Sequence, residues 1–201
     1  MCKIYTRDKS EKLENNIKTF VKNNKFEMGS SKDIIQECRK LGFEVYAMDL
    51  KNIDGLILFD KENNKKVIAV NSNLKIEQVR FAIAHEIGHY IDWNLNKQNF
   101  KRGIAHRDHI FNHNNKPESE QNMDYMSAAI LIPQNELIAK IKDIGLTNKL
   151  KELVENSSGE IKENDIKTIV DNEIIHSIAK EYIVDDEVVV KRLGEVAYYV
   201  Q

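Results

Sequence analysis

The residues best suited to chemistry form the run His-Glu-Ile-Gly-His at 85–89, an HExxH motif. Two histidines four positions apart on a helix lie one turn apart on the same face, so both imidazoles can bind one metal ion. Glu86 is adjacent to the first histidine and points to the side of that ion. A carboxylate in this position can accept a proton from an attacking water molecule, so the motif predicts metal-assisted hydrolysis.

Two histidines leave such a site incomplete, because a catalytic zinc ion takes three protein ligands and keeps one open position. Glu120, early in the next predicted helix, is our first choice for the third ligand. Asp124 lies on the same helix face as Glu120, and we expect it to accept a hydrogen bond from the other ring nitrogen of a ligand histidine. Spacing alone leaves other candidates for the third ligand open: Glu118, Asp108, Asp92, His106, His109 and His113.

The motif lies within a segment of strong helical periodicity, from Ile76 to about Trp93. Its apolar residues fall on the side opposite to the two histidines, which predicts one face packed on a sheet and another face presenting the histidines. The apolar residues in question are Ile76, Val79, Ile83, Ile87, Tyr90 and Ile91.

Short apolar runs at 43–48, 55–60 and 65–71 are rich in Val, Ile and Phe, which is typical of strands, and we expect the last two to form a hairpin. Helices are predicted at 8–27, at 32–41 after a Ser30-Ser31 start signal, at 117–132, at 133–144, and as a pair joined near Asp185. Residues 94–118 are predicted to form a long loop.

These elements predict an α+β fold. A small three-stranded sheet packs on the HExxH helix, the Glu120 helix crosses the opposite face, and a helical C-terminal subdomain follows. The predicted domains are 1–145, which carries the site, and 146–201. Cys38 is expected in the core and His176 on a helix surface.

Composition narrows the class of protein. The chain has 201 residues, 41% of them hydrophobic, and a formal net charge of -2. These values exclude wholesale disorder and argue against charge-driven binding to nucleic acid or membrane. No apolar stretch approaches the roughly 20 residues that span a bilayer, and the N-terminal sequence does not resemble a secretory signal. Cys2 and Cys38 form no disulfide framework, so we expect a cytoplasmic protein.

From residue 41 to residue 133 the chain resembles the ImmA/IrrE family of metallo-endopeptidases, also known as the DUF955 domain. The matching stretches are LGFEVY, IDGLILFD, VIAVNSNLKIEQVRFAIAHEIGHYI, HRD and ESEQNMDYMSAAILIP. The last is similar to the family segment E-x-x-A-N-x-F-A-A-x-L-L-M-P. Alignment on its proline places Glu120 at the family's metal-ligand glutamate, whereas Asp124 falls where the family usually has Asn. The segment 177–195 resembles the helical tail that often follows this domain.

The resemblance implies an endopeptidase that uses Zn2+, although the same donors accept Mn2+ or iron. Glu86 would accept the proton of the attacking water and pass it to the leaving amine. The implied substrate is a helix-turn-helix repressor of a mobile element or a stress regulon. The donor that stabilises the oxyanion stays open among His106, Arg107, Tyr90 and Tyr125.

Three alternatives remain. The chain could be a non-catalytic module that a metal stabilises and that inactivates a repressor by sequestration. The C-terminal helix pair could bind DNA, but it is acidic at 185–187 and offers few cations, so we expect no nucleic-acid partner. A second metal site could form at His106, His109 and His113.

Overall fold

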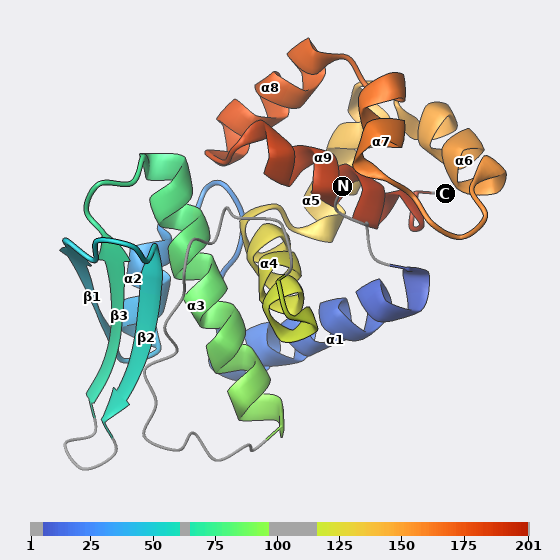
Figure 1. Ribbon diagram of the computed structural model, residues 1–201. Helices are drawn as coiled ribbons and strands as arrows, with labels where there is room; N and C mark the ends of the chain where they lie inside the picture. Colours follow the sequence, from blue (N-terminus) through green and yellow to red (C-terminus); the bar gives the residue numbers. More distant parts are fainter. Residues whose placement is uncertain (1–5, 61–64, 97–115, 201) are drawn as a thin grey trace.

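The predicted α+β fold is confirmed by the computed structural model, which describes residues 6–60, 65–96 and 116–200 (Figure 1). Helices carry most of the chain, and one small sheet lies at one side. The elements are α1 (Arg7–Asn24), α2 (Ile34–Lys40), β1 (Phe43–Met48), β2 (Gly55–Asp60), β3 (Lys65–Asn71), α3 (Ile76–Asn96), α4 (Glu118–Leu131), α5 (Gln134–Asp143), α6 (Thr147–Asn156), α7 (Glu163–Ile169), α8 (Asn172–Tyr182) and α9 (Asp186–Ala197).

The sheet has the order β1-β3-β2, with β3 in the centre. The β3 strand runs parallel to β1 and antiparallel to β2. The predicted hairpin is therefore confirmed, although its turn at 61–64 lies outside the described residues. Ile57 and Ile68 pair across β2 and β3 and are fully buried, so the apolar face of the hairpin forms part of the core.

Helix α3 runs between the sheet and α4, as predicted, and contacts both (Figure 1). Ile83, Ile87 and Ile91 are fully buried, in agreement with the predicted apolar face. The prediction for Ile76 is wrong, because its side chain is 59% exposed. Ile76 is the first residue of α3, where the helix begins at the protein surface.

The start of α2 also differs from the prediction. Asp33 caps this helix, since its Oδ1 atom accepts hydrogen bonds from the backbone N–H groups of Ile35 (2.9 Å) and Gln36 (3.4 Å). The predicted cap at Ser30 and Ser31 is therefore wrong. An ionised Asp is a stronger choice for this position, because its charge also interacts favourably with the helix dipole. The predicted core position of Cys38 is confirmed, and burial raises the pKa of its thiol to about 12.

The C-terminal helices α5 to α8 pack around α9. The predicted pair joined near Asp185 is confirmed as α8 and α9, whereas α6 and α7 were not predicted. Both missed helices are short, and within each of them a single residue is fully buried, Leu150 in α6 and Ile166 in α7. Within the described residues, no helix is both long enough and apolar enough to cross a membrane.

A buried ion network joins these helices to the N-terminal part of the chain. Arg192 of α9 is fully buried and pairs with Glu14 of α1 and with Glu195. Its Nε atom donates to the Ile132 carbonyl at 3.0 Å. The Tyr125 hydroxyl of α4 donates to Glu14 at 3.0 Å. Arg192 thus links residues on both sides of the predicted boundary at 145, and the apolar core also continues across it.

We predict that Arg192→Ala lowers the free energy of unfolding by about 3–5 kcal/mol, because the buried carboxylates of Glu14 and Glu195 lose their cation. Chemical denaturation measures this change. Lys140→Ala is the matched control: it breaks a partly exposed pair with Glu181 (2.6 Å), and we expect a loss below about 1 kcal/mol. Equal effects of the two substitutions would contradict the structural role of the network.

Candidate metal centre

Three predicted side chains meet where α3 faces α4. One nitrogen or oxygen atom each of His85, His89 and Glu120 lies within 4.8 Å of the other two. The Nε2 atom of His85 is 3.6 Å from Oε2 of Glu120, and Nε2 of His89 is 3.9 Å from Oε1 of the same carboxylate. The structure therefore brings together the three residues that the sequence selected.

The helices that carry these side chains explain their convergence. One turn of α3 places the two imidazole rings 5.4 Å apart. Glu120 lies in the first turn of α4, which follows Pro117. The His85 side chain is fully buried, whereas the side chains of His89 and Glu120 are 16% and 25% exposed. The cluster is thus closed at His85 and open to solvent at the other two residues.

The donor set fits a divalent cation. Two neutral imidazoles and one carboxylate are a common catalytic zinc set. Ligands about 2.1 Å from one tetrahedral ion are about 3.4 Å apart. The observed separations of 3.6 and 3.9 Å approach that value and are too long for strong hydrogen bonds. Small side-chain movements would therefore complete three ligands around one ion.

Asp124 is placed to orient His85. Its Oδ1 atom lies 3.0 Å from Nδ1 of His85, and its Oδ2 atom accepts a hydrogen bond from Nζ of Lys116 at 2.8 Å. Burial opposes ionisation of Asp124, but the hydrogen bond with His85 and the charges of Lys116 and Lys191 hold its pKa at about 2. An ionised carboxylate here favours a proton on Nδ1 of His85, which leaves the lone pair of Nε2 available to bind a metal ion on the side of Glu120.

Glu86 lies on another side of α3, against the sheet. It is fully buried, and a Cβ atom placed on Gly55 of β2 would lie 3.3 Å from its Oε1 atom. Glu86 does not belong to the group of three converging side chains among the described residues. The action of Glu86 beside a bound ion therefore stays a prediction.

Other predicted site residues lie elsewhere. The Tyr125 hydroxyl donates to Glu14 and to the Ser10 carbonyl (3.3 Å), so it faces α1 and the prediction of an oxyanion donor there is wrong. The Tyr90 hydroxyl accepts a hydrogen bond from Lys66 at 3.0 Å within an aromatic cluster. Glu118 pairs with Lys9 of α1 at 2.6 Å. His106, Arg107, Asp108, His109 and His113 lie outside the described residues.

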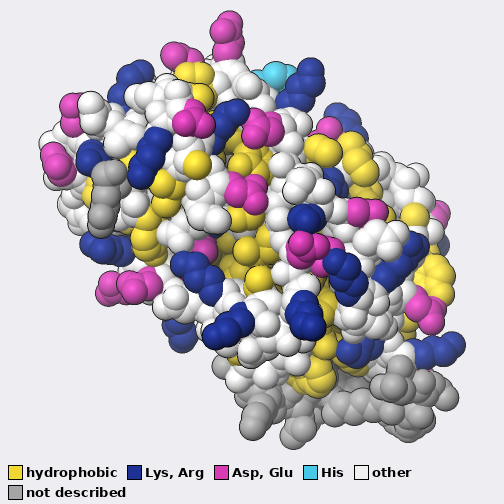
Figure 2. Space-filling model, turned by 180° about the vertical axis from the view of Figure 1, so that it is seen from behind, with side chains coloured by type: hydrophobic (Ala, Val, Ile, Leu, Met, Phe, Trp, Pro, Cys, Tyr) yellow, Lys and Arg dark blue, Asp and Glu magenta, His cyan; other side chains and the backbone are white. Residues whose placement is uncertain are grey.

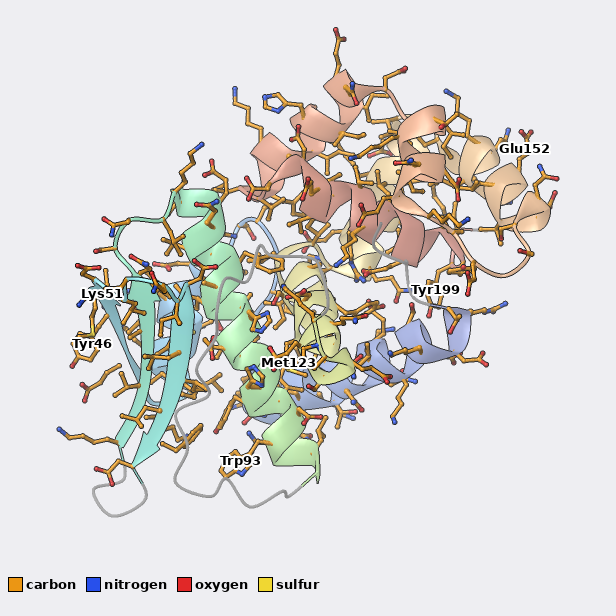
Figure 3. All side chains as sticks on the ribbon, in the orientation of Figure 1. Tyr46, Lys51, Trp93, Met123, Glu152 and Tyr199 are labelled. Atoms are coloured by element: carbon orange, nitrogen blue, oxygen red, sulfur yellow. The ribbon has the colours of Figure 1, made fainter. Side chains whose placement is uncertain are left out.

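The sequence did not indicate two features near the cluster. Gly88 lets α3 approach α4 closely, because a Cβ atom there would lie 3.3 Å from Sδ and 3.5 Å from both Cα and the carbonyl oxygen of Met123. Figure 3 shows Met123 at this contact between the helices. The available signal was a glycine within a strongly periodic helix, where glycine costs about 1 kcal/mol relative to alanine. The Lys116 contact with Asp124 had no comparable signal.

Comparison with known proteins agrees with this geometry. A family model described as the IrrE N-terminal-like domain, Peptidase_M78, matches residues 38–194, which is more than half of the chain. The Metallopeptidase ImmA of Bacillus subtilis (strain 168) is 34% identical over 91 residues. That alignment covers 45% of this chain and 47% of the relative, so the chain spans about half the length of the curated relative it matches.

We predict that Gly88→Val pushes α4 away from α3, because its side chain would collide with the Met123 backbone as well as with its sulfur. The free energy of unfolding should fall by about 1–3 kcal/mol, and affinity for Zn2+ should fall with it. Chemical denaturation and metal titration measure the two effects. Gly88→Ala is the control, because its better helix propensity of about 1 kcal/mol offsets a contact with flexible sulfur. Unchanged metal affinity in Gly88→Val would contradict the proposed importance of this approach.

Proposed function

Because the chain belongs to the IrrE N-terminal-like domain family of metallopeptidases, we propose that it is a metal-dependent endopeptidase. The convergence of His85, His89 and Glu120 carries this proposal. These three side chains would hold the ion, and the buried Glu86 would act beside it. Zn2+ is the first choice, and Mn2+ or iron would suit the same donors.

When bound, the ion supplies a Lewis acid that polarises a peptide carbonyl and makes a water molecule more acidic. Glu86 accepts a proton from the attacking water as general base and then donates it to the leaving amine as the C–N bond breaks. Asp124 keeps the His85 ring oriented through the contact at Nδ1. The close backbone of Gly55 limits the space around the Glu86 carboxylate and so helps to fix its direction.

We further propose that the substrate is a cytoplasmic helix-turn-helix repressor, whose cleavage would derepress mobile-element or stress genes. The resemblance of the segment 41–133 to the ImmA/IrrE family supports this substrate class. The cysteine content supports the location, because buried Cys38 is free and nothing in the sequence indicates a disulfide framework.

We expect purified protein with Zn2+ to cut at least one candidate repressor at a defined peptide bond. Incubation with a panel of such repressors, with and without a chelator, followed by mass spectrometry of the products, tests the substrate class. Metal-dependent fragments from none of them would count against a repressor substrate.

A specific observation favours one alternative, a metal-stabilised module that sequesters its partner. The three candidate ligands come from both α3 and α4, so an ion there would also fasten the two helices together. A DNA-binding role for α8 and α9 has less support, because Arg192 is buried in its ion network. Lys, Arg, Asp and Glu side chains are also interspersed over the face seen in Figure 2.

We predict that Glu86→Gln keeps one metal ion per chain but lowers the cleavage rate by about 10²–10⁴-fold, because the general base is lost. Metal analysis and a cleavage time course measure the two properties. Glu152→Gln on α6, exposed and far from the cluster (Figure 3), is the control and should behave as wild type. If Glu86→Gln still inactivates the repressor fully without cutting it, the sequestering alternative is correct.

A further inference from the structure

A cavity of about 750 Å³ opens beside the candidate metal centre, between α3, α4, α8 and α9. The turn between α8 and α9 lies next to the start of α3 (Figure 1). The volume falls within the range of pockets that hold a ligand or a few side chains. Apolar side chains line much of the interior: Phe81, Ala128, Ala179, Val184 and Val188.

The cavity adjoins the candidate metal centre through Asp124, although His85, His89 and Glu120 are not among the described residues that line it. Asp124 lines the cavity and also lies 3.0 Å from Nδ1 of His85. Phe81, another lining residue, has its ring centroid 6.4 Å from that of His85. A polypeptide bound at the centre could therefore place a neighbouring side chain in this cavity.

The charges around the cavity favour a cation. Among the described lining residues, six carboxylates outnumber three ammonium groups: Glu77, Asp124, Glu163, Asp185, Asp186 and Glu187 against Lys75, Lys180 and Lys191. Asp124 is paired with Lys116, and Asp186 lies 3.3 Å from Nδ1 of His176. Burial and the charges of Glu77 and Glu187 raise the pKa of Asp185, although Lys75 opposes them. A cation near Glu77 and Asp185 would relieve this crowding of negative charge.

We propose that the cavity binds the substrate chain next to the scissile bond, with an apolar side chain in its interior and an adjacent Lys or Arg near Glu77 and Asp185. This inference rests on the proposed peptidase function and adds to it a preference for apolar–basic sequences. Helices α8 and α9 would then take part in substrate selection, because they form one side of the cavity.

Direct binding tests this proposal without requiring cleavage. The protein is metal-loaded Glu86→Gln, and the probe is a fluorescein-labelled peptide with three Leu-Lys pairs separated by Gly-Ser. Matched peptides replace each pair by Leu-Glu or by Ser-Lys. We expect fluorescence anisotropy to show at least about tenfold tighter binding of the Leu-Lys peptide than of either control, since it alone has both the apolar and the basic group.

The double variant Glu77→Gln/Asp185→Asn, made in the same background, removes the proposed acidic partners. The Asn retains a residue suited to the start of α9, and circular dichroism checks the fold. We expect its affinity for the Leu-Lys peptide to fall about fivefold or more. Glu152→Gln/Glu155→Gln, two exposed positions on α6, removes the same charge elsewhere and should leave the affinity unchanged.

Equal affinities for the three peptides, or an unchanged affinity in the Glu77→Gln/Asp185→Asn variant, would overturn the proposal. A protein that sediments as a dimer, and as a monomer once Glu77 and Asp185 are neutralised, would also overturn it by assigning the cavity to a second copy of the chain. Failure of the peptidase function is separate, because it would appear as absent cleavage in the repressor assay while these binding results stand.

Discussion

The close approach of α3 and α4 is the constraint on which the candidate site depends. The two histidines lie on one helix and Glu120 lies on the other, so the spacing between helix axes decides whether the three can meet one ion. Gly88 permits that spacing, because a side chain larger than alanine there would press on the Met123 backbone. Gly88, which has no side chain to offer a metal ion or a substrate, thus has a structural role in the motif.

Contacts behind the site support this geometry. Asp124 contacts His85 at Nδ1, the ring nitrogen that faces away from Glu120, and is itself paired with Lys116. One residue further along α4, Tyr125 turns the other way and joins Glu14 and Arg192. Helix α4 is thereby fixed on one side to the candidate metal centre and on the other to α1 and α9. A protein whose function depends on sub-ångström placement of ligands benefits from such support on both sides of the ligand helix.

Much of this arrangement could be predicted from the sequence, for identifiable reasons. The HExxH spacing fixes two imidazoles on one helix face by helical geometry alone, and the apolar runs fixed the three strands with their observed limits. The direction of Tyr125 could not be predicted, because it depends on Glu14 and Arg192, more than 60 residues away in the sequence on either side. The helices α6 and α7 were missed for a different reason. The spacing of Leu150, Leu153 and Val154 in α6 is typical of a short amphipathic helix. Each of the two helices, however, buries only one residue completely, so its apolar face is too small to stand out in the sequence.

The binding of one divalent cation by His85, His89 and Glu120 is the central claim, and a Zn2+ titration of chelator-treated protein tests it most directly. Wild-type protein should bind one ion per chain, and Glu120→Gln should weaken that affinity by about 100-fold or more through loss of an anionic ligand. Glu118→Gln, two positions away on the same helix and directed to Lys9, should bind as wild type does. Unchanged zinc affinity in Glu120→Gln would contradict the account.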